Sequence, residues 1–368
     1  MATTKTLPSR ADHVGSFLRP KAVAEAREKW RAGTLPASQL KTIEDEAIRG
    51  VVAMQEKSGL KAVTDGEFRR DYWHNDYMDG FEGLDMRDET YGMAFQGGIS
   101  VGTPYVSKKL GDHDGAMHPH FSFLKSVAKQ TAKFCIPAPG MVYMRGGRKA
   151  VSETAYPDLD KFWDDLIGAY QRDVAALENL GCTYLQFDDT SMAYMCDAKF
   201  REQVKARGDD PDKMVERFAK ATSQAISKRS TNLLVTTHTC RGNFKSTWMM
   251  QGGYEPVAEI MFANLDLDAF FMEFDDDRAG GFEPLRFFPK NKTLVLGLVT
   301  TKVGALESKD TIKRRIDDAA KYVPLERLAL SPQCGFASTH HGNAVSEEDQ
   351  RRKLDLVVEI ADEVWGGK

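Results

Sequence analysis

The sequence predicts an α/β protein folded as a (β/α)8 TIM barrel. Eight short apolar runs are spread along the 368 residues, and amphipathic helical patterns lie between most of them. Parallel strands need such long crossovers, and the runs are apolar enough to be buried on both faces. No G-x-G-x-x-G motif follows the first run, which counts against a doubly wound sheet as the alternative.

The expected strands follow the apolar runs in chain order. They fall at 12–17, 61–66, 133–138, 183–188, 233–239, 269–274, 293–299 and 327–332. The expected helices are marked by period, capping and stop signals, at 40–54 before Gly59, at 162–177 before Gly181, at 214–225 after Asp210-Pro211, and after the capping box Ser346-Glu347-Glu348-Asp349.

One stretch after the second strand, about 68–133, interrupts this alternation. It is rich in Gly, Asp, Tyr and Met and has no clean helical period. A connection of this length inside a barrel is usually functional, so it is a candidate lid, hairpin or homodimer contact. Its aromatic residues are candidates to line a substrate cavity, namely Trp73, His74, Tyr77 and Phe81. No linker or repeat divides the chain, so residues 1–368 are expected to form a single domain.

Composition excludes several classes of partner. The net charge of -4 and the pI near 6.1 leave no basic excess for binding a phosphate backbone, so no nucleic acid partner is expected. No apolar run approaches the roughly 18 residues of a membrane span, and the start lacks an apolar signal region. The five cysteines lack the density of a disulfide scaffold. We therefore expect a cytoplasmic protein with no membrane partner.

Four potential metal ligands lie at or just after the polar ends of the later strands. His238 and Cys240 are two residues apart on a β-branched run, so both side chains point to the same side. Glu273 and Cys334 follow in AFFMEFDDD and LALSPQCGF. These are the strand ends where a barrel of this kind carries its chemistry. Thiolate, imidazole and carboxylate ligands together favour zinc as the cofactor.

Six motifs in this order resemble a known family. They are HVGSF near the start, TDGEF after the second strand, LQFDD at the fourth, HTC at the fifth, a lone Glu at the sixth and PQCG at the eighth. Together they resemble the catalytic barrel of cobalamin-independent methionine synthase, in its short single-barrel form, from about residue 10 to 365. The resemblance implies zinc-dependent methyl transfer to a thiol, with homocysteine as acceptor.

The resemblance also implies how the amino-acid acceptor is held. Glu67 and Asp188 match the positions that bind the ammonium group, and Val14, Gly15 and Ser16 match the turn that binds the carboxylate. This pattern agrees with the chemistry of homocysteine, whose ammonium requires carboxylates and whose carboxylate requires N–H or hydroxyl donors.

The expected mechanism requires the acceptor sulfur to be deprotonated, as a thiolate. A free thiol with a pKa near 8.5 is mostly protonated at neutral pH, whereas metal binding keeps it deprotonated. Glu273 is the ligand expected to give way to the sulfur, because a carboxylate oxygen exchanges more readily than a thiolate. His340 and His341 follow the last strand, and His340 is a candidate catalytic proton acceptor alongside Asp188.

Two departures from the family pattern bear on the methyl donor. Asp188-Asp189-Thr190 stands where the full-length family has Asp-Glu-Pro, and the segment after Pro137-Ala138-Pro139-Gly140 continues MVYMRGG without a tryptophan. The segment after Gly140 lies where the family places a folate-contacting segment. The identity of the methyl donor therefore stays open, and the candidates are methyltetrahydrofolate, a methylated corrinoid protein and a small methylated compound.

Other functions compete with this interpretation. Zinc-dependent addition of a thiol to an epoxide or another alkyl donor would use the same ligands. Uroporphyrinogen-type decarboxylation would not need the HTC and PQCG ligands, so stoichiometric zinc discriminates against it. A non-catalytic zinc-stabilised binding protein would need neither an open ligand position nor ammonium-binding carboxylates.

Overall fold

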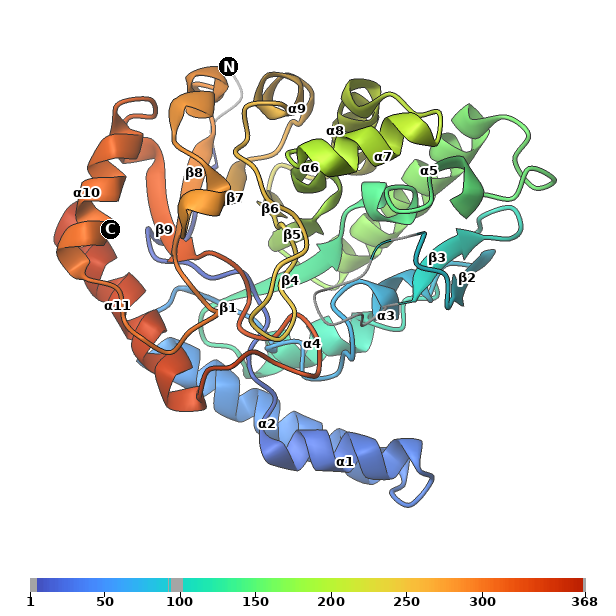
Figure 1. Ribbon diagram of the computed structural model, residues 1–368. Coiled ribbons are helices and arrows are strands. Elements are labelled where there is room, and N and C mark those ends of the chain that lie inside the picture. Colours follow the sequence, from blue (N-terminus) through green and yellow to red (C-terminus); the bar gives the residue numbers. More distant parts are fainter. Residues whose placement is uncertain (1–4, 92, 94–101, 367–368) are drawn as a thin grey trace.

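A curled parallel sheet forms the centre of the protein, and helices cover its outer face (Figure 1). The computed structural model describes residues 5–91, 93 and 102–366. The sheet has seven strands in the order β1-β4-β5-β6-β7-β8-β9, all paired in parallel. The strands are β1 (Ala62–Val63), β4 (Thr131–Pro137), β5 (Tyr184–Asp189), β6 (Leu234–Thr239), β7 (Ala269–Glu273), β8 (Thr293–Val299) and β9 (Leu328–Pro332). Seven of the eight predicted strands are therefore confirmed, although β1 is shorter than expected.

The helices lie largely where their sequence signals place them. They are α1 (Lys21–Arg31), α2 (Ala37–Lys57), α3 (Asn75–Met78), α4 (His118–Val127), α5 (Leu159–Asn179), α6 (Ser191–Tyr194), α7 (Ala198–Ala206), α8 (Pro211–Ala225), α9 (Ala258–Asn264), α10 (Lys309–Ala320) and α11 (Glu347–Trp365). The Asp210 carboxylate accepts hydrogen bonds from the first backbone N–H groups of α8. Ser346 and Asp349 form the predicted capping box at the start of α11.

The segment predicted as the first strand, 12–17, is not a strand, and that prediction is wrong. It makes only isolated parallel bridges, from Ala11 to Leu330 of β9 and from Ser16 to Gly66 just after β1. Gly15 has a φ of 140°, a conformation essentially reserved for glycine, and it interrupts the extended backbone. The segment nevertheless lies between the two edge strands of the sheet, so its side chains reach the centre of the molecule.

The long stretch after β1 contains a small hairpin and two of the helices. Strands β2 (Leu84–Arg87) and β3 (Thr103–Val106) pair in antiparallel fashion, as in the hairpin that the sequence offers as one of three possibilities. The role of the whole stretch stays a prediction, and residues 92 and 94–101 lie outside the described residues. Tyr77 and Phe81 are buried in the core and are absent from the wall of the cavity at the strand ends. They pack against His113 and Tyr170 with ring centroids 4.3 to 5.8 Å apart.

Buried charges fix the segment between the sheet edges from inside. The Lys133 ammonium of β4 lies 3.2 Å from an Asp12 carboxylate oxygen and donates to the His13 carbonyl at 2.6 Å. Tyr184 of β5 donates to the other Asp12 oxygen at 2.7 Å. All four residues are fully buried or nearly so. Removing one partner of such a buried pair typically costs about 3–5 kcal/mol, so residues 12–16 are held firmly in place.

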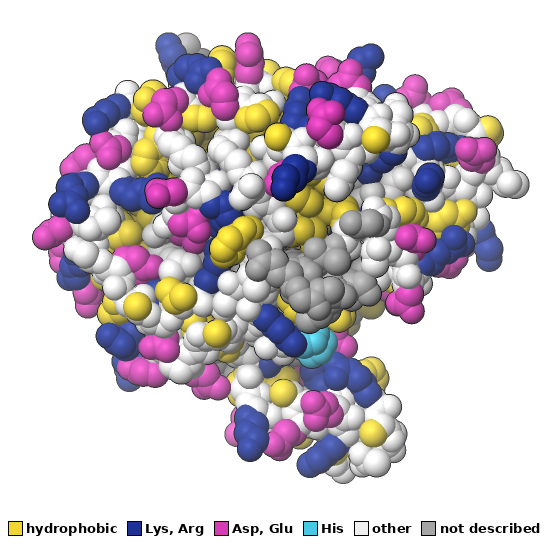
Figure 2. Space-filling model, viewed as in Figure 1, with side chains coloured by type: hydrophobic (Ala, Val, Ile, Leu, Met, Phe, Trp, Pro, Cys, Tyr) yellow, Lys and Arg dark blue, Asp and Glu magenta, His cyan; other side chains and the backbone are white. Residues whose placement is uncertain are grey.

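The surface carries mixed charge. On the face shown in Figure 2, the described Lys and Arg side chains are interspersed with Asp and Glu, which agrees with the small net charge of -4. Helices α1 and α2 project from the body as a hairpin in both views (Figures 1 and 2). In the described part of the chain, no helix is both long and apolar enough to cross a membrane.

Candidate metal and substrate site

A cavity lies at the carboxyl ends of the strands. Its walls contain both groups that the sequence singles out. His238, Cys240 and Cys334 come from the ends of β6 and β9, and Glu67 and Asp188 from the ends of β1 and β5. Strand pairing accounts for part of this convergence, because Asp188 and His238 are register partners on neighbouring strands.

His238, Cys240 and Cys334 form a compact group of potential ligands. Their nearest ligand atoms all lie within 4.8 Å of one another, and all three residues are buried. The two sulfurs are 3.5 Å apart, too far for a disulfide and close to the separation of two thiolates on one tetrahedral zinc. Both ring nitrogens of His238 are buried without a hydrogen-bond partner. The donor set and this orphaned imidazole fit a zinc ion.

The pKa values of the two cysteine thiols are shifted in opposite directions. The hydrogen bond from Cys240 holds the pKa of the Cys334 thiol well below its usual range, with His238 acting in the same direction. The same contact, together with burial, raises the pKa of Cys240. One sulfur of the pair is thus already poised as a thiolate, the form that binds metal.

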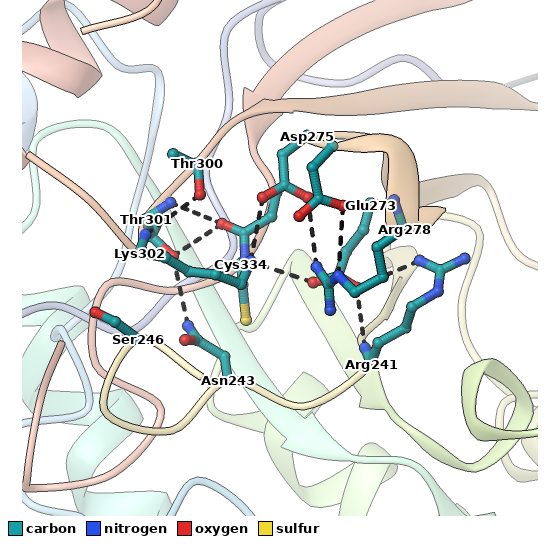
Figure 3. Close-up of polar contacts among 12 residues, drawn as sticks. Arg241, Asn243, Ser246, Glu273, Asp275, Arg278, Thr300, Thr301, Lys302 and Cys334 are labelled. Atoms are coloured by element: carbon teal, nitrogen blue, oxygen red, sulfur yellow. Dashed lines mark hydrogen bonds and ion pairs between the residues drawn. The ribbon is translucent and has the colours of Figure 1, made fainter. Parts of the chain in front are cut away.

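Glu273, the fourth predicted ligand, lies beside this group rather than within it. Its Oε1 is 4.0 Å from the Cys240 sulfur. Its Oε2 accepts hydrogen bonds from the backbone N–H and the guanidinium of Arg241, at 3.0 and 3.4 Å (Figure 3). The cluster of mutually close ligand atoms in the described chain contains only the other three residues.

Glu67 is a buried carboxylate held in a strained conformation. Its φ of 59° is left-handed, which is unusual for a residue with a side chain and is typically retained at functional sites. Oε1 is 3.7 Å from the Arg70 guanidinium, whereas Oε2 is buried without a partner. Burial raises the pKa of Glu67 to about 8, with the Asp188 charge adding to the effect. Among the described residues, Oε2 of Glu67 therefore has no hydrogen-bond partner.

Asp188 lies next to Glu67. One carboxylate oxygen of Asp188 and one of Glu67 lie within 4.8 Å of each other, and the Cys135 sulfur is the third member of this second cluster. Gln186 donates to Asp188 at 2.7 Å and to the Val14 carbonyl at 2.6 Å, which fixes the carboxylate. Burial raises the pKa of Asp188 to about 6. Two buried carboxylates facing each other form a natural site for an ammonium group.

Two of the three residues of the predicted carboxylate-binding turn lie on the cavity wall. Val14 and Ser16 line the cavity. Gly15 does not, and it is packed so closely that a Cβ there would lie 2.7 Å from the Cys135 sulfur. Gly15 therefore allows the turn to approach β4, while its neighbours face the cavity.

The remaining sequence candidates divide between the cavity wall and its surroundings. Trp73 and His74 line the cavity, with ring centroids 4.6 Å apart. His340 does not line it; its backbone N–H and Nδ1 both contact the Asp71 carbonyl, at 2.8 and 3.3 Å. His341 is exposed, and its ring packs against that of His340 with the two centroids 3.8 Å apart. The catalytic role of His340 stays a prediction.

Two residues of the site were missed by sequence reasoning. Arg241 directly follows the HTC motif, and a charged residue at a buried strand end was a usable signal that something ionic lies beside the metal group. Gln186 lies two residues before Asp188 and therefore on the same side of β5. Its contact with Val14 joins segments far apart in sequence, and the sequence contained no signal for it.

Fold and site together define an α/β protein with a cluster of potential metal ligands and a pair of buried carboxylates at the carboxyl ends of parallel strands. More particularly, the chain belongs to the family described as the cobalamin-independent synthase catalytic domain, whose model matches residues 9–363. It is 44% identical to the uncharacterized protein YxjH of Bacillus subtilis over 364 residues, covering 97% of this chain and 95% of that protein.

Two further comparisons extend this relationship. The crystal structure of a Listeria monocytogenes protein, whose name refers to vitamin-B12 independent methionine synthase, is 35% identical with a TM-score of 0.80, covering 98% of this chain and 99% of that one. The methionine synthase of Pyrococcus horikoshii is 23% identical over 332 residues, covering 88% of this chain and 85% of that protein.

Proposed function

We propose that the protein transfers a methyl group to the sulfur of homocysteine, giving methionine. One observation carries the proposal: a His-Cys-Cys ligand group and a pair of under-compensated carboxylates line one cavity. A thiol-binding metal group alone would accept any thiol. The carboxylate pair at Glu67 and Asp188 adds the requirement for a cation on the same molecule, as in an amino-acid thiol.

Each predicted residue has a role in orienting this acceptor. The acceptor ammonium donates hydrogen bonds to Glu67 and Asp188, and Gln186 keeps Asp188 in position. The acceptor carboxylate accepts from Ser16 and the adjoining turn at Val14 and Gly15. This binding at one end of the molecule directs the sulfur towards His238, Cys240 and Cys334.

The chemistry forms one carbon–sulfur bond and breaks the bond between the methyl group and the donor. A zinc ion held by His238, Cys240 and Cys334 would stabilise the acceptor sulfur as a thiolate. The thiol proton leaves through the cavity, and the donor's leaving group takes up a proton. Asp188 at the cavity wall and His340 near its mouth are the proposed proton acceptors.

Trp73 and His74 line the same cavity, and we propose that the methyl donor also binds there. Candidate donors are methyltetrahydrofolate, a methylated corrinoid protein and a small methylated compound. We also propose that residues 1–368 form one catalytic domain, in which the segment with the bridges at Ala11 and Ser16 takes the place of the eighth strand of a (β/α)8 barrel.

The test is product formation with defined donors. Zinc-loaded protein is incubated with homocysteine and each donor in turn, and methionine is measured by mass spectrometry. Methionine should form with at least one donor and not with the Cys334→Ser variant, whereas Cys182→Ser, a substitution outside the site, should retain activity. Activity with thiols that lack an ammonium group, equal to that with homocysteine, would overturn the proposed acceptor.

A further inference from the structure

We propose that the His74 imidazole binds the methyl donor through hydrogen bonds, and that it selects a donor with a neutral or anionic polar group over a simple sulfonium or quaternary ammonium compound. The donor site is then a part of the cavity wall separate from the carboxylate pair at Glu67 and Asp188. This inference rests on the proposed function, because it takes the second substrate of the cavity to be the methyl donor.

The His74 side chain has unsatisfied hydrogen-bonding capacity. It lines the cavity and is only 4% exposed. Neither of its ring nitrogens has a hydrogen-bond partner among the described residues. Buried polar groups are nearly always satisfied, so this imidazole indicates a ligand that supplies the partner. His74 belongs to neither of the two groups of potential metal ligands in the described chain, and the ligand indicated is therefore not a metal ion.

The His74 ring is neutral at physiological pH. Burial holds the pKa of His74 well below its usual range, and the positive charge of Arg145 acts in the same direction. A neutral imidazole offers one N–H donor and one acceptor nitrogen. It therefore matches a polar group that accepts or donates a hydrogen bond, whereas a trimethylsulfonium or tetramethylammonium ion can do neither.

Charge distinguishes this part of the wall from the end that holds the acceptor ammonium. Arg145 also lines the cavity and is 8% exposed. The Arg145 guanidinium and the Cys240 sulfur both influence the pKa of Tyr194, so Tyr194 connects this part of the wall to the metal group. Neither Glu67 nor Asp188 contributes to the pKa shifts of His74 and Arg145. A cationic donor beside His74 would meet a like charge, which disfavours it relative to a neutral or anionic one.

The segment that carries His74 is fixed in place. Tyr72 forms an isolated bridge with Thr339 in the loop after β9, and the Trp73 backbone N–H donates to the Ser338 carbonyl at 3.1 Å. The Trp73 ring packs against the imidazole, with the two centroids 4.6 Å apart. Because the imidazole is already held at the cavity wall, a donor that binds there loses little affinity to the ordering of the protein.

Two variants and a comparison of donors test the assignment. His74→Phe keeps a ring and removes both hydrogen bonds, and His74→Gln restores one donor and one acceptor. His120→Phe is the matched control, because its Nδ1 is also buried without a partner among the described residues, yet the residue lies in α4, away from the cavity wall. Methionine formation from homocysteine is measured with methyltetrahydrofolate, with a methylated corrinoid protein and with trimethylsulfonium, and kinetic constants are determined for both substrates.

The expected pattern separates donor binding from a general structural role. Wild type should form methionine with methyltetrahydrofolate or the corrinoid protein, and not with trimethylsulfonium. His74→Phe should lower kcat/KM for the donor at least about tenfold, the effect of one lost hydrogen bond at a buried site. The KM for homocysteine should stay unchanged, which a general loss of structure would not allow. His74→Gln should recover part of the loss, and His120→Phe should match wild type.

Two results would overturn this inference and leave the proposed function standing. One is methionine formation from trimethylsulfonium at a rate equal to or above that from the other donors. The other is a His74→Phe variant whose kcat/KM for the donor is unchanged, or falls together with an equal rise in the KM for homocysteine. Methionine formation with none of the donors would instead overturn the proposed function, and this inference with it. If His74→Phe fails to fold, the comparison of donors with wild type still decides the inference.

Discussion

Replacing Glu67 with Gln removes one negative charge from the carboxylate pair while keeping the size of the side chain. Burial raises the pKa of Glu67 to about 8 in the ligand-free protein. At pH 7 only about one tenth of the molecules then carry the charge, so an ammonium ligand must first displace a proton, at a cost of about 1.4 kcal/mol. Ligand binding should therefore strengthen as the pH rises.

Methionine is a suitable probe, since it shares the ammonium and carboxylate of homocysteine and has no thiol to titrate. Its affinity for the wild type should rise about fivefold between pH 7 and pH 8, where half of the Glu67 carboxyls are ionised. In Glu67→Gln this rise should vanish. Affinity at pH 8 should fall by about 1.5–3 kcal/mol, the value of a charge-assisted hydrogen bond.

Calorimetry from pH 6 to 8.5 measures both quantities. Glu348→Gln, at an exposed position on α11, is a matched control for the loss of one carboxylate. A Glu67→Gln variant that keeps the fivefold rise would show that another group titrates. Unchanged methionine affinity at pH 8 would refute the ammonium site itself.

Two further predictions concern the metal group and the long stretch after β1. Cys240→Ser and Cys334→Ser should each lose most of the bound zinc, measured by elemental analysis, because serine is a poor ligand at neutral pH. The control variant Cys182→Ser should keep its zinc. Full zinc occupancy in both site variants would refute the ligand assignment. The hydrogen bond at 2.7 Å to Asp173 raises the pKa of His118, so this pair stabilises the fold at acid pH and its contribution is lost as the pH rises through that raised value. The site is partly exposed, so solvent screening reduces the contribution of the pair. In urea unfolding, His118→Gln should be less stable than wild type by about 0.5–1 kcal/mol at pH 5.5 and by much less at pH 8.5. An equal loss of stability at both pH values would contradict this prediction.

The sequence predicts the sheet well because burial on both faces leaves a signal. The run around Leu294 and Val295, for example, is apolar throughout and becomes β8. The segment 12–17 has only Val14 and Phe17 as large apolar residues, and its placement depends on Gly15 and on the Asp12–Lys133 pair, which joins distant parts of the chain. Periodicity contains no information about either of these features.

The site shows the same division. His238, Cys240 and Cys334 were predicted because their residue types and strand-end positions carry metal chemistry, and the structure brings them together. Arg241 was missed because adjacency to a motif does not reveal a partner. Only the pairing of β6 with β7 places Arg241 beside Glu273 and gives that carboxylate a competing contact.

The left-handed backbone at Glu67 has a consequence for attempts to make the protein more heat-resistant. A residue with a Cβ at this φ costs about 1–2 kcal/mol relative to glycine. Glycine at position 67 would relieve this strain, but it would also remove the carboxylate that lies 3.7 Å from the buried Arg70 guanidinium, a loss that typically costs about 3–5 kcal/mol. Selection for survival at high temperature should therefore retain a carboxylate at this position, and the stability of the fold and the recognition of an ammonium group depend on the same side chain.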